Sequence, residues 1–477
     1  MSEVTNEPKV DEQTSQEEQS PEVTKTEVKS TNSQSESKTV SAEDSESSSN
    51  SSSNHGCGLI NEKTVIEIDY KQNLLAATTF EDLHLREELI RSVYVEFKYE
   101  KPSLIQAQGL PYILQDPPVN LIAQAQNGSG KTGCFVLGML SRVNEHIQAP
   151  QVLCLCPTRE LAIQNYDIIQ KFGKYCSFTY RLLLKDGEES AVTEQVLVGT
   201  PGTINNLIKK RFFNTRDMKM MVIDEADEML KDANGSRQFT LGNTCITIQK
   251  AMPRRNFQLL LFSATFAENV LSFAKKLCRD PVVIKKKEED LKLDNVPLYF
   301  VLNKNEEEKY QNIIKLYDIM NVGQTVIFVN SAGVADKLAN FLREHDYTAN
   351  ILYGKMQNET RDRVVKEFKQ GITKILIATN VIARGLDVPA VTLVINFEIP
   401  VVKGQPDYAN FLHRIGRTGR MGRAGVAVSF ILKEAESIDQ LKSIEQFYHM
   451  NMISLNPEDY DEVEHMLEKA EQYNATL

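Results

Sequence analysis

Residues 120–140 read NLIAQAQNGSGKTGCFVLGML, and this stretch predicts a strand, a turn and a helix in succession. It begins with an apolar run typical of a buried strand, turns through small residues, and continues as an apolar segment of helical length. Small residues in such a turn can point backbone N–H groups at phosphates, beside the N-terminus of the helix that follows. The residues that would form this turn are Gly128, Ser129 and Gly130.

Two side chains after the turn suit a nucleoside triphosphate. Lys131 would reach the terminal phosphates, and Thr132 would give its hydroxyl to Mg²⁺. The usual phosphate-loop pattern has glycine where this chain has Ala125. The same letters also fit the dinucleotide motif G-x-G-x-x-G, but that motif requires an acidic residue ~20 positions further on. Because the chain has only the apolar run QVLCLC (151–156) there, the sequence favours a nucleoside triphosphate site.

A pair of acidic residues supplies the second half of such a site. Residues 218–230 read MKMMVIDEADEML, so an apolar strand is expected to end at Asp224, which Glu225 follows at once. Asp224 would hold Mg²⁺ through water, and Glu225 would orient and activate the attacking water. Acidic residues also begin many helices without any catalytic role. We favour catalysis because the phosphate loop lies about 90 residues upstream, on what we expect to be a neighbouring strand.

The pattern of the whole chain predicts two α/β domains. Apolar runs rich in β-branched residues alternate with amphipathic segments from about residue 80 onward. Continuous apolar strands separated by helices indicate parallel sheets covered on both faces. The charged stretch KKKEEDLKLDN at 285–295 interrupts the alternation, which then resumes. We therefore predict domains at 71–285 and 296–477, joined by a linker at 286–295.

The N-terminal segment differs from the rest of the chain. The first 55 residues are mainly Ser, Glu, Thr and Gln. Such a segment cannot bury enough apolar surface to offset the entropy of ordering, so we predict a disordered acidic arm over residues 1–70. The arm could be a solubilising tail or a phosphorylatable regulatory segment. Whether residues 56–79 form an autoinhibitory helix in the cleft stays open.

The net charge of −11 at pH 7 does not exclude nucleic acid as a partner. Residues 1–55 contain 12 acidic and 4 basic residues, and residues 454–477 contain 7 and 1, which leaves +3 for the residues between. The central part of the chain is therefore nearly neutral and could carry a basic groove.

The composition also indicates in which cellular compartment the protein is expected. No apolar run approaches the ~18 residues of a membrane-spanning helix, and the N-terminus has no apolar signal segment, so we expect no membrane insertion. Seven cysteines without a CxxC pair favour reduced thiols in a nuclear or cytoplasmic protein. Cys154 and Cys156 are expected in a core strand.

Nine strings follow one another in a fixed order: YEKPSLIQ, AQNGSGKT, PTRELA, GTPGT, DEAD, SAT, VIFVNS, ATNVIARGLDV and HRIGRTGR. In this order they resemble the motifs of the DEAD-box RNA helicases, and the resemblance extends from about Phe80 to about residue 465. It implies two RecA-like domains in tandem, with ATP in the cleft between them and RNA bound across both.

The resemblance implies which residues bind ATP. Tyr99 would stack on adenine, supported by Phe80, and Gln106 would hydrogen-bond the adenine edge, since a side-chain amide both donates and accepts. Asp387 would meet the ribose, and two arginines would stabilise the γ-phosphate in the transition state. The implied nucleotide-binding residues are Phe80, Tyr99, Gln106, Ala125, Gln126, Asn127, Gly128, Ser129, Gly130, Lys131, Thr132, Asp387, Arg417 and Arg420. Those implied in catalysis are Lys131, Asp224, Glu225, Arg417 and Arg420, and those at the metal are Thr132 and Asp224.

The resemblance also implies an RNA groove. Short hydroxyls, backbone amides and arginines would contact phosphate and ribose with little sequence preference, and contacts to the 2′-OH would favour RNA over DNA. Taken singly, each of these polar residues more commonly caps a loop. The implied RNA contacts are Pro157, Thr158, Arg159, Thr200, Pro201, Gly202, Asn330, Ser331, Gly354, Arg361 and Thr379. Domain closure would be relayed by Ser263, Ala264, Thr265 and His413.

Three departures from the family pattern affect single RNA contacts and not the ATPase. The usual Gly-Gly between PTREL and GTPGT is absent from LLLKDGEESAV (182–192). Residues 352–356 read LYGKM where His-Gly is commoner, and Asn358 replaces the Gln of Q-x-x-R before Arg361.

Four segments resemble the subgroup of these helicases that acts in mRNA export at the cytoplasmic face of the nuclear pore. They are DPPVNLIAQAQ (116–126), LFSATFAENVLSFAKK (261–276), VVKGQPDYANFLHRIG (401–416) and PEDYDEVEHMLEKA (457–470). The resemblance implies remodelling of messenger ribonucleoprotein, an export co-activator with inositol hexakisphosphate, and a nucleoporin tether on the cytoplasmic pore filaments. It also implies a monomer in cytoplasm and nucleus, enriched at the cytoplasmic face of the pore.

Two alternatives remain at the level of the sequence. The first is a helicase of the translation-initiation type, whose chains lack the long acidic arm and the Gly-Gln insertion. The second is an ATP-gated RNA clamp that acts as a scaffold, because clamping and unwinding use the same residues.

Overall fold

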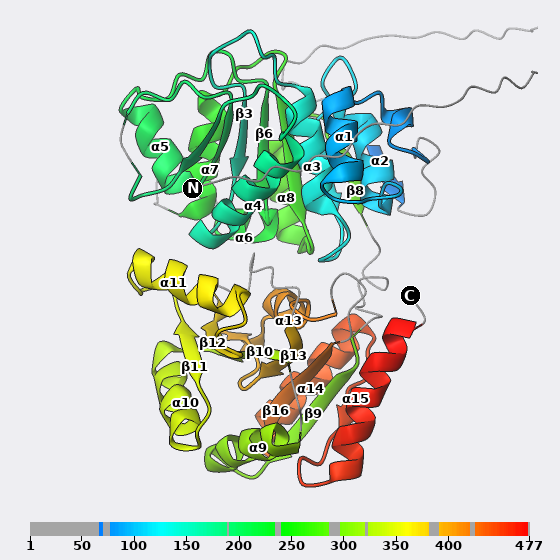
Figure 1. The fold of residues 1–477 in the computed structure, drawn as a ribbon, viewed down its shortest axis with the longest axis vertical. Coiled ribbons are helices and arrows are strands. Elements are labelled where there is room, and N and C mark those ends of the chain that lie inside the picture. Colours follow the sequence, from blue (N-terminus) through cyan, green and yellow to red (C-terminus); the bar gives the residue numbers. More distant parts are fainter. Residues whose placement is uncertain are drawn as a thin grey trace, which may run out of the picture. The chain divides into compact units, whose positions relative to one another are not determined.

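The computed structural model describes residues 66–69, 77–187, 190–233, 240–285, 296–319, 323–380, 391–419 and 425–475 (Figure 1). The predicted linker, Asp387, Arg420 and most of the predicted arm lie outside these ranges. Within them, the helices are all too short or too polar to cross a membrane.

The first domain is built on an eight-stranded sheet whose paired strands all run parallel, as the apolar strand pattern predicts. Its order across the sheet is β1 (Ile66–Asp69), β8 (Val282–Lys285), β2 (Leu121–Gln124), β7 (Gln258–Ser263), β6 (Met220–Asp224), β3 (Val152–Leu155), β5 (Val196–Gly199) and β4 (Tyr180–Leu183). The short 3₁₀ helix η1 (Glu81–Leu83) precedes the helices of this domain.

Helices cover both faces of the first sheet because successive strand residues point to opposite sides. Leu121 and Ala123 of β2 belong to one core, whereas Ile122 belongs to the other. The first core is completed by α1 (Glu87–Val95), α2 (Leu104–Ile113), α3 (Lys131–Ser141) and α4 (Arg159–Phe172). The second is completed by α5 (Pro201–Lys209), α6 (Ala226–Leu230), α7 (Leu241–Ala251) and α8 (Glu268–Leu277). Cys154 lies in β3 and is fully buried in the first core, as predicted, whereas Cys156 is equally buried but follows the end of the strand.

The strand order corrects one expectation. Strand β7 lies between β2 and β6, so the strand that leads into the phosphate loop is not adjacent to the strand that ends at Asp224. Crossover connections set the order of parallel strands, and sequence separation does not reveal it. The SAT string, which begins at the last residue of β7, therefore lies between the two halves of the predicted nucleotide site.

The first sheet also extends further toward the N-terminus than we expected. Strand β1 falls within the range 1–70 that we assigned to the arm, yet it pairs in parallel with β8. Without β1, strand β8 would be an edge strand with a row of unpaired backbone groups.

The second domain repeats the arrangement with seven strands, and its neighbouring pairs are also parallel. Their order is β11 (Ala349–Leu352), β12 (Ile375–Thr379), β10 (Gln324–Val329), β13 (Val391–Asn396), β16 (Val426–Leu432), β9 (Leu298–Asn303) and β17 (Ile453–Ser454). One core includes α11 (Asn358–Lys369), α13 (Tyr408–Ile415) and α14 (Ala435–Tyr448), and the other includes α9 (Glu306–Ile319), α10 (Ala332–Glu344) and α15 (Tyr460–Ala475). The predicted fold class, two RecA-like parallel-sheet domains in tandem, is confirmed.

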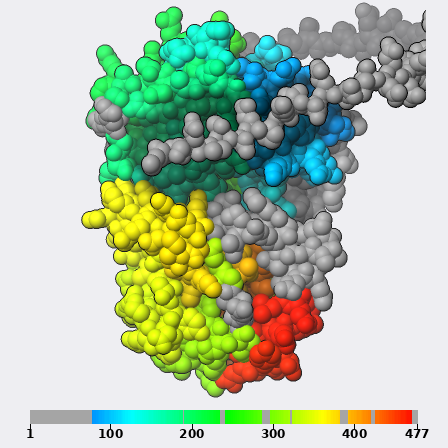
Figure 2. All heavy atoms as spheres, viewed as in Figure 1, coloured from blue at the N-terminus to red at the C-terminus, as the bar shows by residue number. Residues whose placement is uncertain are grey.

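The last helix, α15, is amphipathic. Val463 and Met466 are buried in the core of the second domain, while Asp461, Glu462 and Glu468 are exposed. In the space-filling view this helix (red) accordingly contributes to the molecular surface (Figure 2). Its apolar stripe is narrow because only one side of the helix contacts the sheet.

The inserted segment before HRIGRTGR forms a hairpin. Strands β14 (Val401–Val402) and β15 (Gln405–Pro406) pair antiparallel. The two residues between them, Lys403 and Gly404, both have positive φ angles of 52° and 79°. A two-residue loop of this kind matches the twist of a hairpin, and it tolerates lysine less readily than glycine.

Close packing of α2 on α3 gives the first testable prediction. A Cβ atom on Gly138 would lie 2.4 Å from Cγ2 of Ile113, whereas one on Gly202 would meet no atom of the described residues within 4 Å. We expect Gly138→Ala to lower the free energy of unfolding by about 1–3 kcal/mol through overpacking. Gly202→Ala, also helical, should be neutral or gain up to ~1 kcal/mol from helix propensity. Urea unfolding of both variants tests the packing, and equal stabilities would contradict it.

Candidate nucleotide and RNA site

Apart from Phe80, Tyr99 and Gln106, which precede β2, the predicted site residues of the first domain lie at or just after the carboxyl ends of five adjacent strands, β2, β7, β6, β3 and β5. In a parallel sheet these ends lie along one edge, which is where such folds bind ligands. In the second domain, β10, β11 and β12 are likewise adjacent, and the predicted RNA contacts Asn330, Gly354 and Thr379 lie at or just after their ends. The fold therefore brings segments that are far apart in the sequence to one edge of each sheet.

The phosphate loop joins β2 to α3 through a tight turn. Gly128 and Gly130 have φ angles of 79° and 95°, a conformation that side chains disfavour. A Cβ atom on Gly130 would also lie 2.5 Å from Oγ of Ser103, so the loop has no room for one. Among the residues that the structure describes, no side chain caps the N-terminus of α3. Its first N–H groups are therefore available to an anion.

Polar atoms in the loop fit a phosphate group. Nζ of Lys131, which is 8% exposed, donates to the carbonyls of Ala125 (2.6 Å) and Gln126 (3.2 Å) and to Oδ1 of Asn127 (3.3 Å). Oγ of Ser129 is buried and has no hydrogen-bond partner among the described residues. A buried ammonium beside an unpaired hydroxyl and uncapped amides favours a negatively charged ligand.

Gln106 connects the helix before the loop to the loop itself. Its Oε1 accepts from the backbone N–H of Ser103 (3.0 Å), and its Nε2 donates to the carbonyl of Gly130 (3.1 Å). Of the two aromatic residues expected around adenine, Phe80 is fully buried with its ring perpendicular to that of Tyr94, and Tyr99 is half-buried beside Phe97.

The acidic pair lies at the end of β6. Asp224 and Glu225 are each 5% exposed, and Oδ1 of Asp224 accepts from the N–H of Glu225 at 3.0 Å. Burial, and after it the charge of Glu225, raises the pKa of Asp224 to about 7, against the lowering effects of Asn165 and Lys131. Two adjacent buried carboxylates of this kind favour a bound cation.

Glu225 itself has an unusual backbone. Its φ and ψ angles of 48° and 54° lie in the left-handed region, where residues other than glycine are uncommon. Strain of this kind is kept where the surrounding structure fixes a side chain for function. Here the strained turn ends strand β6 and begins helix α6 within one residue.

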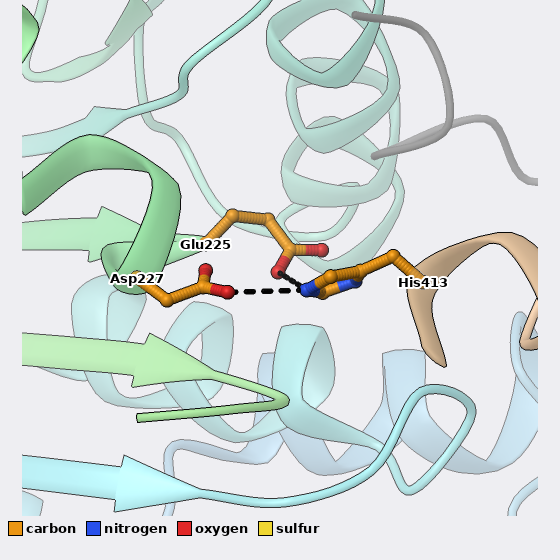
Figure 3. Close-up of side chains that lie close together, drawn as sticks. All are labelled: Glu225, Asp227 and His413. Atoms are coloured by element: carbon orange, nitrogen blue, oxygen red, sulfur yellow. Dashed lines mark hydrogen bonds and ion pairs between the residues drawn. The ribbon is translucent and has the colours of Figure 1, made fainter. Parts of the chain in front are cut away.

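A chain of polar contacts runs from the phosphate loop to the second domain. Because Oδ1 of Asn127 faces Lys131, its Nδ2 faces Nδ1 of His413 at 3.5 Å. Nε2 of His413 lies 3.2 Å from Oδ2 of Asp227 and 4.0 Å from Oε2 of Glu225 (Figure 3). A carboxylate only accepts, so Nε2 carries the proton and Nδ1 accepts from Asn127.

The chain continues from Asp227 to the SAT string. Oδ2 of Asp227 also accepts from Oγ1 of Thr265 at 2.7 Å. Glu225, Asp227 and His413 each offer a possible metal ligand within 4.8 Å of the others, but His413 and Asp227 already satisfy each other by hydrogen bonding. We therefore interpret this cluster as a contact between the two domains. Ser263 and Ala264 are buried at the same strand end.

The two arginines among the predicted RNA contacts form ion pairs between α4 and α11. Arg361 lies 2.7 Å from a carboxylate oxygen of Glu160, and both side chains are buried. Arg159 binds the carboxylate of Asp362 through Nε (3.2 Å) and Nη2 (2.8 Å) and also contacts Asp186. These partners, Asp362 first, raise the pKa of Arg159. In this arrangement both guanidinium groups are engaged by protein.

The remaining predicted RNA contacts occupy loops and helix starts. Thr158 and Ser331 cap α4 and α10 by accepting from backbone N–H groups at 3.3 Å, which is the common structural role for such residues. Gly202 and Gly354 are exposed, Pro157 and Thr200 are half-buried, and Pro201 is buried at the first position of α5.

Arg414 organises the site in the second domain. It is fully buried and donates to Oδ1 of Asn380 (2.7 Å), Oδ1 of Asn330 (2.8 Å) and the carbonyl of Glu398 (2.6 Å). Burial lowers its pKa to about 9. Its neighbour Arg417 is also buried and donates through Nε to the carbonyl of His413 (3.0 Å).

Three residues of the site were missing from the sequence-based set: Asp227, Asn165 and Arg414. Asp227 lies in the DEAD string and Arg414 in HRIGRTGR, so the motifs contained a signal for both. Asn165 has no such signal, since only the folded chain brings α4 against β6.

Fold and site together define a two-domain nucleotide-dependent enzyme of the RecA type. Residues 103–273 match the model of the DEAD/DEAH box helicase family, and residues 308–422 match that of the helicase conserved C-terminal domain. The chain is 41% identical over 404 residues to ATP-dependent RNA helicase DBP5 of Lodderomyces elongisporus, covering 84% of this chain and 77% of that protein. It therefore belongs to the DEAD-box family of ATP-dependent RNA helicases.

Solved structures agree with this assignment. The chain is similar to Saccharomyces cerevisiae Dbp5 bound to RNA and ADP BeF3, with a TM-score of 0.78 and 39% identity over 83% of this chain and all of that one. It is also similar to S. cerevisiae Dbp5 in complex with Nup159, Gle1, IP6 and ADP, with a TM-score of 0.60 and 37% identity over 81% and 100% of the two chains. The resemblance inferred from the sequence motifs, including that to the export subgroup, is confirmed.

The bond between Thr265 and Asp227 can be tested by substitution. We expect Thr265→Val to lower the free energy of unfolding by about 1.5–3 kcal/mol, because a carboxylate acceptor loses its donor in a buried site. Thr265→Ser keeps the hydroxyl and should stay closer to wild type. Urea unfolding followed by circular dichroism measures both. Equal losses for the two variants would show that the hydroxyl does not stabilise Asp227.

Proposed function

We propose that this chain remodels messenger ribonucleoprotein during mRNA export, using ATP to bind and release RNA. The observation that carries the proposal is the polar chain from Lys131 through Asn127 and His413 to Asp227, since it links a phosphate site to the second domain. Similarity to Dbp5 in complexes with RNA and with Nup159, Gle1 and IP6 supplies the biological context.

ATP is held mainly by the first domain in this proposal. Lys131 and the amides of the phosphate loop bind the terminal phosphates, with Tyr99, Gln106 and Phe80 at the adenine. Glu225 orients and activates the attacking water. The second domain adds contacts to ribose and γ-phosphate through Asp387, Arg417 and Arg420. Arginines that stabilise the charge of this transition state can contribute ~10³–10⁵ in rate.

Mg²⁺ is the metal that this site fits. The hydroxyl of Thr132 and the carboxylate of Asp224 offer the hard oxygen ligands that Mg²⁺ prefers. The buried pair of carboxylates at Asp224 and Glu225 supports a cation at this position. Bound there, Mg²⁺ would neutralise charge on the phosphates.

RNA lies across both domains in this proposal. The polar residues at strand ends contact phosphate and ribose, so binding depends little on base sequence. Arg159 and Arg361 are currently bound by carboxylates, and each can exchange part of that contact for a phosphate. ATP and RNA together close the cleft. Closure then affects Ser263, Ala264 and Thr265 through the contact between His413 and Asp227. Hydrolysis and phosphate release reopen it.

The cellular part of the proposal follows from relatives. Dbp5 has been solved with Gle1, IP6 and Nup159, so a co-activator with inositol hexakisphosphate and a nucleoporin are the expected partners of this chain. We place the chain in cytoplasm and nucleus, enriched at the cytoplasmic face of the pore.

The catalytic assignment predicts the behaviour of Glu225→Gln. Loss of the base should lower RNA-stimulated ATP hydrolysis by ~10²–10⁴, while the ATP-bound complex with RNA persists longer. The matched control is Glu228→Gln, because Glu228 lies one position beyond the DEAD string and pairs with Lys231 at 2.6 Å. It should keep hydrolysis within about twofold. Wild-type turnover in Glu225→Gln would refute the assignment.

The proposed role in export predicts where the protein lies in the cell and how a co-activator stimulates its ATP turnover. A tagged, functional copy should give a nuclear rim signal that disperses when the cytoplasmic pore filaments are removed. The co-activator should raise ATP turnover of the purified chain only when inositol hexakisphosphate is present. A uniform cytoplasmic signal without this stimulation would favour the translation-initiation type of helicase. An RNA complex that outlives many rounds of ATP consumption would favour a clamp.

A further inference from the structure

Asn165 lies beneath the catalytic edge of the first sheet. It belongs to α4, the helix that begins at Arg159 after strand β3. Its side chain is fully buried in the first domain. No motif contained it, and its amide lies near the thiols of Cys154 and Cys156.

The amide of Asn165 binds the carboxylate of Asp224 directly. Nδ2 donates to Oδ2 of Asp224 at 2.8 Å, while Oδ1 of the same carboxylate accepts from the N–H of Glu225 at 3.0 Å. Because a carboxylate only accepts, the NH₂ end of the amide must be the end that faces it. Both oxygens of Asp224 are thus held from defined directions, one by its own backbone turn and one by α4.

The hydrogen-bonding capacity of the Asn165 amide that Asp224 does not use is poorly satisfied. Among the described residues, Nδ2 otherwise contacts the sulfur atoms of Cys156 (3.3 Å) and Cys154 (3.8 Å), which are weak acceptors. Oδ1 of Asn165 is buried without a hydrogen-bond partner among the described residues. An unpaired buried amide oxygen destabilises the fold, and leucine would fill a similar volume without leaving a polar atom unpaired. The amide offers one favourable interaction that leucine lacks, the hydrogen bond to Asp224.

We propose that Asn165 is a positioning residue, which holds the carboxylate of Asp224 in the orientation from which it binds the metal ion of the nucleotide complex. The inference rests on the proposed role of Asp224 at Mg²⁺. Partners that orient a metal ligand commonly change metal affinity by ~10–100-fold when removed. A residue that only supported the core would change stability and leave metal binding unaltered.

The test measures how Mg²⁺ affects binding of a fluorescent ADP analogue to the full chain. The Mg²⁺ concentration that gives half of the metal-dependent rise in affinity is determined for wild type, Asn165→Leu and Asn165→Ala. Leucine keeps the volume without the donor, and alanine removes the donor without adding bulk beside Asp224. We expect both to raise that concentration about tenfold or more, with affinity for the analogue in chelator unchanged.

The matched control is Asn312→Leu in the second domain. Asn312 is also buried and donates to Oδ1 of Asn303 at 2.9 Å, so its loss removes a similar bond far from the nucleotide. It should lower the melting temperature without moving the Mg²⁺ dependence.

Three results would overturn the proposed role of Asn165. Shifts below twofold in both folded Asn165 variants, with normal Mg²⁺ dependence in wild type, overturn it and leave the proposed function intact. An equal loss of affinity in chelator also overturns it, because Asn165 would then support the phosphate loop. A wild type without any Mg²⁺ dependence would remove the metal site itself and the inference with it.

Discussion

The rest of the site depends on one oxygen atom, Oδ2 of Asp227. It accepts from Thr265 in its own domain at 2.7 Å and from His413 of the second domain at 3.2 Å. This one atom therefore contacts both the SAT string at the end of β7 and helix α13, which precedes Arg417. Because all three residues are buried, solvent cannot replace either donor without opening the contact.

The two sheets explain why such a contact is possible. Apolar strands buried on both faces form rigid platforms, and their carboxyl ends present loops at fixed positions. The strained backbone of Glu225 and the turn at Gly130 are stable only on such a platform. The order of strands then places the SAT string between the phosphate loop and the DEAD string, where it can respond to both.

Much of this could be predicted from the sequence. Strand-like runs and the glycine-rich turn follow from local periodicity and turn chemistry, and the nine motifs in order identify the family. The neighbours in space could not be predicted. Spacing along the chain does not reveal that β7 separates β2 from β6, nor that Asn165 reaches Asp224. The ion pairs of Arg159 and Arg361 likewise depend on contacts between segments about 200 residues apart.

We expect the contact between His413 and Asp227 to couple closure of the two domains to ATP and RNA. The most direct measurement is energy transfer between dyes on exposed positions of the two domains, with a non-hydrolysable ATP analogue and RNA present. Wild type and a control with the exposed His465 replaced by alanine should populate the closed state only with both ligands. His413→Ala should bind both ligands and remain mostly open. An unchanged closed population in His413→Ala would contradict the account.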